Sequence, residues 1–410
     1  IDCQQAGRAF YFGSGETGES VIDNFVVQNG RVEEAYGGAI LCENNSSPTI
    51  RNCVFQSNKA EDTNSSPDVE YGGAIYCSSS SLTIMNCTFS SNSAVAGGAI
   101  YCNSSNPSIT RCTFTDNKAV DYEGGAIYCF WSSPSIANCT FSGNSAAGPL
   151  HARGGAIYCD PCSGLTVTNS AFSGNSADVE GGAICCWYSS SATITITNCD
   201  FNDNRCQYNG GAIYCNGSSP NITNCTFSGN AANEGGAICC WGSSNASITN
   251  CLFSGNSTND HGAAIFCNGS SPNIANSTFS GNSAGCWGGA IYSYNSSSPT
   301  LNNCILWGNS AGSSGNEIHI ADLSASCTLN YCCVDNTGYG GQTGNITESN
   351  CIYADPQFVD AAGGDYHLKD TSPCVDAGDN SLVPSGVDKD LDGNPRVVNG
   401  TVDIGAYERQ

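Results

Sequence analysis

Residues 97–102, Gly-Gly-Ala-Ile-Tyr-Cys, are followed after a polar turn by residues 107–112, Pro-Ser-Ile-Thr-Arg-Cys, and then by Phe114 and Asn117. Each apolar run is only four to six residues long, and its side chains alternate between the two faces, which is typical of a β-strand. The residues between the runs are glycine, serine, asparagine and proline, which favour turns. The segment therefore predicts short strands joined by turns, with no helix between them.

This segment repeats along most of the chain. The isoleucine of Gly-Gly-Ala-Ile recurs at positions 40, 75, 100, 127, 157, 184, 213, 238, 265 and 291, and a degraded copy, Gly-Asn-Glu-Ile, ends at Ile318. A Phe-x-x-Asn element follows in step, and its asparagines are Asn58, Asn92, Asn117, Asn144, Asn175, Asn204, Asn230, Asn256, Asn282 and Asn309. Short strands that recur at a fixed period, three per coil, predict a parallel β-helix in which equivalent residues stack as ladders.

We therefore expect an all-β fold, a single-stranded right-handed parallel β-helix (solenoid) of about eleven rungs, with a small irregular C-terminal cap. The repeat domain is expected over residues 1–320 and the cap or anchor-like region over residues 321–410. The isoleucines and phenylalanines should form internal ladders, and the asparagines should form a ladder at a turn. The first residues, Ile1-Asp2-Cys3, read as the interior of a strand, so we expect the precursor to begin further upstream.

The composition of the chain excludes several classes of partner and indicates a location. The formal net charge is −24, with only 12 Lys and Arg residues, which argues against nucleic acid and anionic membrane surfaces as partners. No run of about 18 apolar residues is present, so we expect no membrane-spanning helix. The 28 cysteines indicate an oxidising compartment, and we expect an extracellular or cell-surface protein.

Most cysteines fall into two ladders. One ladder follows the isoleucine by two positions and the other precedes the Phe position by two, as Cys102 and Cys112 do. They act either as small buried hydrophobes or as disulfides between neighbouring rungs, and pairing within a rung is disfavoured by distance. True bridges are better placed among ten further cysteines, which are Cys162, Cys185, Cys206, Cys239, Cys286, Cys327, Cys332, Cys333, Cys351 and Cys374.

The pairing of Gly-Gly-Ala-Ile with Phe-x-x-Asn over roughly residues 20–310 resembles the repeats of polymorphic outer membrane proteins and of other bacterial extracellular right-handed β-helix proteins. Residues 355–360, 372–378 and 403–408 are similar to the choice-of-anchor region that ends many such proteins. The resemblance implies export and display at the cell surface. Autotransporter members continue into a membrane β-barrel and anchor-type members often carry a terminal sorting segment; because residues 1–410 do not carry these features, we expect proteolytic maturation or secretion into the matrix.

One loop has the spacing of a metal site. Asp388, Asp390 and Asp392, followed by Gly393, have the D-x-D-x-D-G pattern of a calcium loop, in which alternate carboxylates converge on the ion. The twelfth position is Asn399 instead of glutamate, and no flanking helices are evident. The alternative is a hydrogen-bonded acidic loop that engages Arg396. We assign no catalytic residues and no other cofactor.

The leading hypothesis is an extracellular structural or adhesive surface protein that assembles end to end into a filament, with itself, other surface proteins or glycans as partners. The alternative is a carbohydrate-binding or polysaccharide-cleaving β-helix. Few basic residues and no shared rung position for the histidines argue against an enzyme. Aromatic residues expected on one outward face would suit sugar stacking, and they are Tyr76, Tyr101, Tyr128, Tyr158, Tyr214, Trp187 and Trp241.

Overall fold

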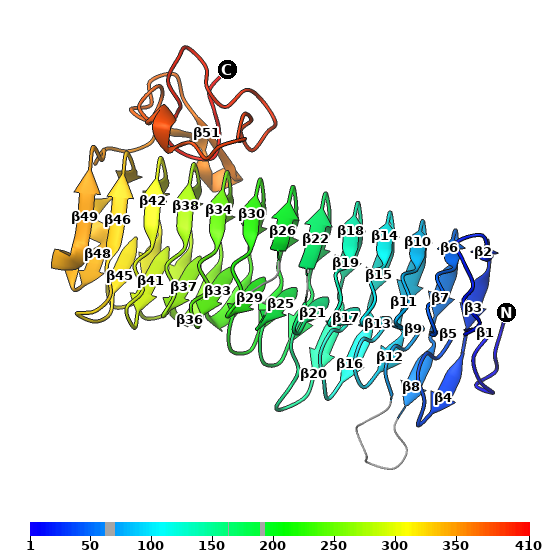
Figure 1. Ribbon diagram of the computed structural model, residues 1–410. Helices are drawn as coiled ribbons and strands as arrows, with labels where there is room; N and C mark the ends of the chain where they lie inside the picture. Colours follow the sequence, from blue (N-terminus) through cyan, green and yellow to red (C-terminus); the bar gives the residue numbers. More distant parts are fainter. Residues whose placement is uncertain (62–69, 163, 189–192) are drawn as a thin grey trace. The chain divides into compact units, whose positions relative to one another are not determined.

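The computed structural model describes residues 1–61, 70–162, 164–188 and 193–410, and Figure 1 shows its short strands. The chain forms two compact units: Ile1–Thr195 with Asp203–Tyr208, and Ile196–Asn202 with Asn209–Gln410. Both units are built from short parallel strands in four rows, one more row than the sequence predicts. The fourth row follows the ladder asparagine. Within the described residues, no helix is long and apolar enough to span a membrane.

The strands of the first unit pair in parallel, each with its equivalent one turn on. The first row contains β1 (Phe10–Phe12), β5 (Ile40–Cys42), β9 (Ile75–Ser78), β13 (Ile100–Asn103), β17 (Ile127–Phe130), β21 (Ile157–Cys159) and β25 (Ile184–Trp187). The second row contains β2 (Val21–Asp23), β6 (Thr49–Arg51), β10 (Thr83–Met85), β14 (Ser108–Thr110), β18 (Ser135–Ala137) and β22 (Gly164–Thr168). The third row contains β3 (Val26–Gln28), β7 (Val54–Gln56), β11 (Thr88–Ser90), β15 (Thr113–Thr115), β19 (Thr140–Ser142) and β23 (Ala171–Ser173). The fourth row contains β4 (Arg31–Glu33), β8 (Lys59–Glu61), β12 (Ser93–Ala94), β16 (Lys118–Val120), β20 (Ser145–Ala147), β24 (Ser176–Ala177) and β28 (Arg205–Cys206).

The second unit has the same four rows, and the boundary between the units falls within β26 (Thr193–Thr197), after Thr195. Its first row contains β29 (Ile213–Asn216), β33 (Ile238–Trp241), β37 (Ile265–Asn268), β41 (Ile291–Tyr294), β45 (Ile318–Ile320) and β48 (Tyr339–Gly341). The second row contains β30 (Asn221–Thr223), β34 (Ser247–Thr249), β38 (Asn273–Ala275), β42 (Thr300–Asn302), β46 (Cys327–Asn330) and β49 (Ile346–Ser349). The third row contains β27 (Asp200–Asn202), β31 (Thr226–Ser228), β35 (Leu252–Ser254), β39 (Thr278–Ser280), β43 (Ile305–Trp307) and β47 (Cys333–Val334), and the fourth contains β32 (Ala231–Glu234), β36 (Ser257–His261), β40 (Ser283–Ala284) and β44 (Ser310–Ala311).

The expected ladders are confirmed. In the first unit Ile100 pairs with Ile127, and Phe114 pairs with Phe141. The Phe114 and Phe141 rings stack with centroids 4.7 Å apart, and both side chains are fully buried. Each motif isoleucine begins a first-row strand from β5 to β45, and β1 and β48 add one strand at each end of that series. The predicted eleven rungs are therefore close to the observed number.

The asparagine ladder is buried and continuous within each unit. Asn144 donates from its backbone N–H and from Nδ2 to Oδ1 of Asn175, at 3.0 and 2.9 Å. Its Nδ2 also donates to the carbonyl of Phe114 in the preceding turn. The side chain thus satisfies backbone groups that the turn would otherwise leave unpaired in the core. The glycine pair is required nearby, because a Cβ at Gly98 would lie 2.2 Å from the carbonyl oxygen of Gly125.

The ladder cysteines act mainly as hydrogen-bonding residues. The backbone N–H of Cys87 donates to Sγ of Cys112 at 3.4 Å, and this Sγ lies 3.3 Å from the carbonyl oxygen of Thr110. Ser170 takes the same place in a later turn and accepts from the N–H of Cys139 at 3.1 Å. Within the part of the chain that the structure describes, no disulfide bond joins the cysteines. Bridges among the remaining cysteines stay a prediction.

The solenoid extends further than the sequence predicts. Four strands after residue 320, β46 to β49, continue the first three rows, so the boundary expected at 320 falls before the final turn. The cap that follows contains an antiparallel hairpin of β50 (Phe358–Asp360) and β51 (Asp365–Leu368). The 3₁₀ turns are η1 (Asn336–Gly338), η2 (Thr343–Asn345), η3 (Ala361–Gly363) and η4 (Asn380–Leu382).

Candidate functional site

The C-terminal cap docks on the outward side of the third row in the second unit. Leu252 and Ile305, at outward positions of β35 and β43, pack in one buried cluster with Phe358, Leu368 and Ile404 of the cap. In the first unit the equivalent positions of β11, β15 and β19 are threonines, which are half-buried or exposed. Leu252 and Ile305 therefore place apolar residues under the cap, whereas Thr278, at the same position of β39 between them, stays a threonine.

Hydrogen bonds fix the position of the cap. The N–H of Asp379 donates to Oδ1 of Asn303 at 2.9 Å, and Nδ2 of Asn303 donates to the carbonyl of Asp379 at 3.0 Å. Asn303 also accepts from the N–H of Gly405 through its own backbone carbonyl. The N–H of Ala406 donates to Oγ1 of Thr278, which is an outward side chain of β39. The cap therefore forms a rigid wall beside β39 and β43.

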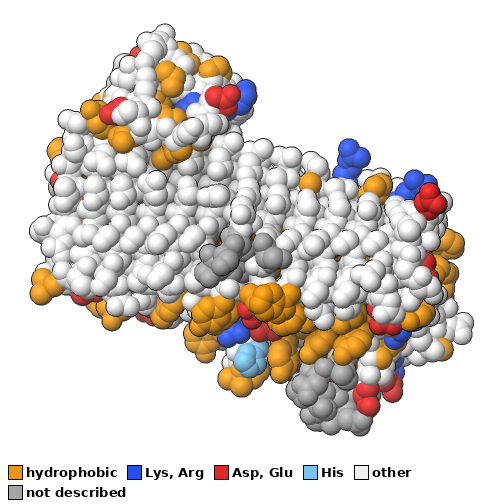
Figure 2. Space-filling model, in the orientation of Figure 1, with side chains coloured by type: hydrophobic (Ala, Val, Ile, Leu, Met, Phe, Trp, Pro, Cys, Tyr) orange, Lys and Arg blue, Asp and Glu red, His pale blue; other side chains and the backbone are white. Residues whose placement is uncertain are grey.

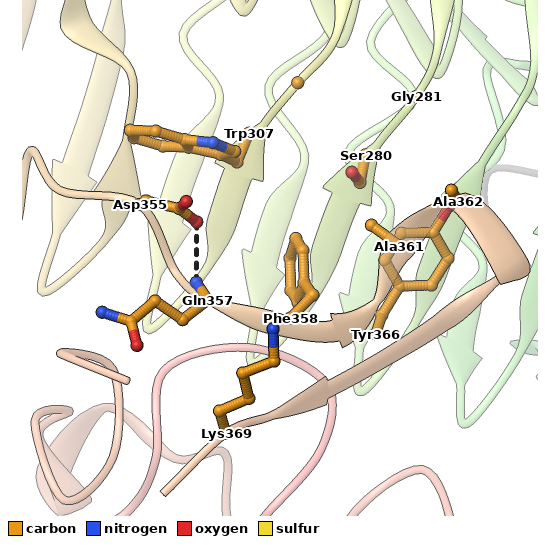
Figure 3. Close-up of a pocket in the computed structure, with 11 residues that line it drawn as sticks. Ser280, Gly281, Trp307, Asp355, Gln357, Phe358, Ala361, Ala362, Tyr366 and Lys369 are labelled. Carbon is orange, nitrogen blue, oxygen red and sulfur yellow. Dashed lines mark hydrogen bonds between the residues drawn. The ribbon is translucent and has the colours of Figure 1, made fainter. Parts of the chain in front are cut away.

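A pocket of about 530 Å³ lies between this wall and the ends of β39 and β43 (Figure 3). Figure 3 shows Trp307 and Asp355 at one side, Tyr366 at the other and Phe358 between them. The residues that line the pocket are Ser280, Gly281, Trp307, Gly308, Asp355, Gln357, Phe358, Ala361, Ala362, Tyr366 and Lys369. The pocket therefore combines aromatic rings with a few charged and amide groups, as ligand sites usually do.

The polar groups of the pocket are held in place by local bonds. Oδ1 of Asp355 accepts from the N–H of Gln357 at 2.8 Å, which is the bond drawn in Figure 3. The N–H of Lys369 donates to the carbonyl of Gln357 at 3.1 Å, while the Lys369 side chain is exposed. The rings of Phe358 and Tyr366 meet edge to face with centroids 5.3 Å apart. Burial raises the pKa of Tyr366, so its hydroxyl stays protonated and can donate a hydrogen bond.

Sequence analysis missed this pocket, although a signal was present. Trp307 stands where Ser254 and Ser280 follow the aromatic residue of their turns. A bulky aromatic residue at a position where the two preceding turns have serine indicates a local contact that the repeat itself does not require. The partners Asp355 and Lys369 could not be found in this way, because the cap has no repeat.

Two of the three predicted calcium ligands, Asp390 and Asp392, are engaged in other contacts through their carboxylates. Asp390 is buried, and its two oxygens accept from the N–H groups of Asn394 and Glu408 at 2.8 and 3.0 Å. Oδ2 of Asp392 lies 2.6 Å from Nε2 of His367. Among the described residues, no group of three His, Cys, Asp or Glu side chains is arranged to hold a metal ion. A calcium site at Asp388, Asp390 and Asp392 stays a prediction.

The loop that contains these aspartates is organised by hydrogen bonds to Arg396. Its buried guanidinium donates to the carbonyls of Asp403, Gly405 and Ala406 at 2.8–3.0 Å, and its Nη2 lies 3.7 Å from Glu408. The backbone carbonyl of Asp388 accepts from the N–H of Arg396. These contacts agree with the hydrogen-bonded loop that was the alternative to calcium, although the arginine reaches carbonyls rather than the three aspartate carboxylates.

His367 connects the hairpin to this loop. Its Nδ1 lies 2.6 Å from Asp365 and its ring packs against Tyr407 with centroids 4.3 Å apart. Partial burial lowers the pKa of His367, but the hydrogen bonds to Asp392 and Asp365 outweigh this and raise it overall. The histidine therefore carries positive charge more readily than a free side chain does, and it pairs two acidic segments of the cap.

The predicted tyrosine face is not open. Tyr76, Tyr101, Tyr158 and Tyr214 do lie on the outward side of the first row, but each is at most 7% exposed. A second column covers part of them, since Tyr36 stacks on Tyr76 at 4.3 Å and Tyr71 stacks on Tyr101 at 4.6 Å. The expectation that these tyrosines offer rings to a sugar is therefore wrong for these four. Tyr128, Trp187 and Trp241 are half-buried.

Comparison with known proteins agrees with this architecture. The family model described as a right-handed β-helix region matches residues 9–155 and 155–334. No curated protein matches the sequence. The matched residues cover most of the chain, including the strands that carry Ser280 and Trp307, while the cap lies beyond them. The chain belongs to the family of right-handed β-helix proteins.

Proposed function

We propose that this protein is an extracellular adhesive protein that binds carbohydrate in the pocket beside its C-terminal cap. The observation that carries the proposal is that Trp307 lines this pocket together with the polar groups of Asp355, Gln357 and Lys369. A sugar ring has an apolar face of C–H groups and an edge of hydroxyls. The half-buried Trp307 ring suits the face, and the carboxylate, amide and ammonium groups suit the hydroxyls.

The proposal is for binding without cleavage. Glycoside hydrolysis ordinarily requires two carboxyl groups on either side of the scissile bond. Among the described residues that line this pocket, Asp355 is the one carboxylate. Its pocket partners Trp307 and Lys369 can orient a sugar but do not replace the second carboxyl group. A polysaccharide-cleaving enzyme is therefore less well supported by this site than a glycan-binding adhesin.

End-to-end assembly into filaments stays a prediction. The last second-row strand, β49, exposes Thr347, Glu348 and Ser349. An unpaired strand edge can accept another strand, but a charged side chain on that edge disfavours the addition. Glu348 is such a residue. Sedimentation velocity over a range of protein concentrations would detect filament growth directly.

Isothermal titration of the whole chain against a panel of soluble oligosaccharides and polysaccharides tests the binding proposal. We expect one sugar class to bind, and Trp307→Ala to weaken it about fivefold to tenfold, because an aromatic contact contributes roughly 1 kcal/mol. Tyr294→Ala is the matched control, since Tyr294 is a 43% exposed aromatic residue of the second unit that does not line the pocket. Equal loss in both variants, or no binding by the unmodified protein, would refute the proposal.

A further inference from the structure

An unusual backbone conformation recurs in the first unit, in the turn that follows the first-row strands. The position two residues after the cysteine has positive φ in most turns, and small residues such as Ser79 and Ser104 occupy it with φ of 50°. Trp131 and Tyr188 occupy the same position with φ of 51° and 45°. Bulky residues rarely adopt this left-handed conformation, and such strain in a folded protein points to a functional site.

The two aromatic residues are also unusually exposed. Trp131 is 58% and Tyr188 is 63% exposed. A small polar serine is at ease in water at this position, whereas a large aromatic ring leaves apolar surface in contact with solvent. Each forms an edge-to-face pair with the residue before it, Phe130 with Trp131 at 6.2 Å and Trp187 with Tyr188 at 5.5 Å. The pairs lie two turns apart, roughly 10 Å along the stack of strands. Figure 2 draws much of one face in white, the colour of the backbone and the remaining side chains, and hydrophobic side chains gather along part of its lower border.

A polar group lies in the turn between the two pairs. The backbone N–H of Trp131 donates to the carbonyl of Pro161 in the next turn. The residue before Pro161 is the half-buried Asp160. The Tyr158 hydroxyl donates to Oδ2 of Asp160 at 3.2 Å and so fixes the carboxylate. Asp160 is partly withdrawn from water, and this burial raises the pKa of its carboxyl group. One carboxylate is thus held between two exposed aromatic pairs.

A largely buried network of ion pairs contacts the pair formed by Trp187 and Tyr188. The guanidinium of Arg153 lies 4.2 Å from the centroid of the Trp187 ring. Arg153 also pairs with Glu123 at 3.2 Å and with Glu180 at 2.7 Å. A cation held against one face of Trp187 fixes that ring, and the T-shaped contact then fixes Tyr188.

We propose that the Trp131 and Tyr188 aromatic pairs and Asp160 form a second carbohydrate site, which binds a neutral polysaccharide chain along three successive turns. Sugar rings stack on the two exposed aromatic side chains, and their hydroxyls donate to the Asp160 carboxylate. An open row of rings suits an extended chain better than a single sugar. The net charge of −24 repels acidic polymers and favours a neutral one. The site shares its ligand class with the proposed function but rests on other residues.

The test replaces each strained aromatic residue with the serine that other turns use. We expect Trp131→Ser and Tyr188→Ser to keep or raise the midpoint of thermal unfolding, because the left-handed strain is reduced. Binding of a neutral polysaccharide, chosen from β-glucan, mannan and galactan, should weaken at least about fivefold in each variant. Tyr208→Ala is the control, since Tyr208 is a 51% exposed aromatic residue of the same unit outside the site.

The outcomes separate this site from the cap pocket. Loss of polysaccharide binding in Trp131→Ser with retention in Trp307→Ala supports the second site alone. Retention of binding in both serine variants overturns this inference, whether or not Trp307→Ala loses it. If the unmodified protein self-associates in sedimentation velocity and the serine variants do not, while neither binds any polysaccharide, the patch is a protein interface and the inference is wrong.

Discussion

The side-chain amide of Asn309 donates to Oε2 of Glu317 at 2.6 Å, and the Asn309 backbone N–H donates to Oε1 at 3.3 Å. In earlier turns these two donors go to the next asparagine, as those of Asn256 go to Asn282. Glu317 stands at the alanine position of the last Gly-Gly-Ala-Ile copy, where Ala290 stands one turn before. The copy that looks degraded in sequence thus supplies the acceptor that ends the ladder.

The protonation of Glu317 should make stability depend on pH. Burial raises the pKa of Glu317 from 4.5 to about 7, against the opposing effect of the Asn309 hydrogen bonds. The folded protein holds this proton more tightly than the unfolded chain does. Its contribution is therefore complete below pH 4.5 and lost as pH rises through 7, and it amounts to roughly 3 kcal/mol.

Denaturation midpoints measured from pH 4 to pH 8 for the unmodified protein and Glu317→Gln test this dependence. Burial also raises the pKa of Glu123 and of Glu408 to about 7, so both proteins should lose stability over this range. The variant should lose less. Parallel curves for the two proteins would contradict the assignment to Glu317.

Asn144→Ala should destabilise the first unit by about 2–4 kcal/mol, because it leaves the buried donors of Asn117 and the carbonyl of Phe114 without partners. Asn221→Ala, at an exposed strand position, should change stability by less than about 0.5 kcal/mol. Chemical denaturation followed by circular dichroism measures both. A similar loss in the two variants would mean that the ladder has no special role.

Serine should replace a ladder cysteine with little effect. Cys112→Ser keeps an acceptor for the N–H of Cys87, as Ser170 does for Cys139, and should cost under about 1 kcal/mol. Cys112→Val leaves that buried N–H unpaired and should cost roughly 1–3 kcal/mol. Thermal unfolding compares the two. If serine were the more damaging substitution, the cysteine would act through packing or a disulfide instead.

The outward apolar residues under the cap should hold it in place. Leu252→Thr combined with Ile305→Thr restores the residue type of the uncovered turns and removes apolar contacts with Phe358 and Leu368. We expect hydrogen exchange of the 350–410 amides to accelerate about tenfold or more, while exchange in β13 and β17 stays unchanged. Thr226→Ser, at the equivalent position two turns before Thr278, is the control. Unchanged exchange in the cap would mean that the Asn303 and Thr278 hydrogen bonds suffice.

Periodicity made the solenoid predictable. Most turns repeat the same inward residues, so one local interpretation of Ile100, Phe114 and Asn117 applies to most of the chain. The parallel register follows because equivalent residues stack on one another. The fourth row was missed because its strands are short and carry little beyond Ser-Ala, as in Ser93–Ala94. The boundary at 320 was placed too early because β46 to β49 no longer carry the motif.

The sequence by itself determined the repeating fold, its inner ladders and its polar outer surface, since each of these depends on contacts between equivalent positions of neighbouring turns. Only the tertiary structure decided what lies over that surface. The cap places Asp355 and Lys369 beside Trp307, and the second column covers Tyr76 and Tyr101. These contacts join residues with no common period, so no pattern along the chain encodes them. They follow from the three-dimensional packing of non-repeating segments against the regular strands.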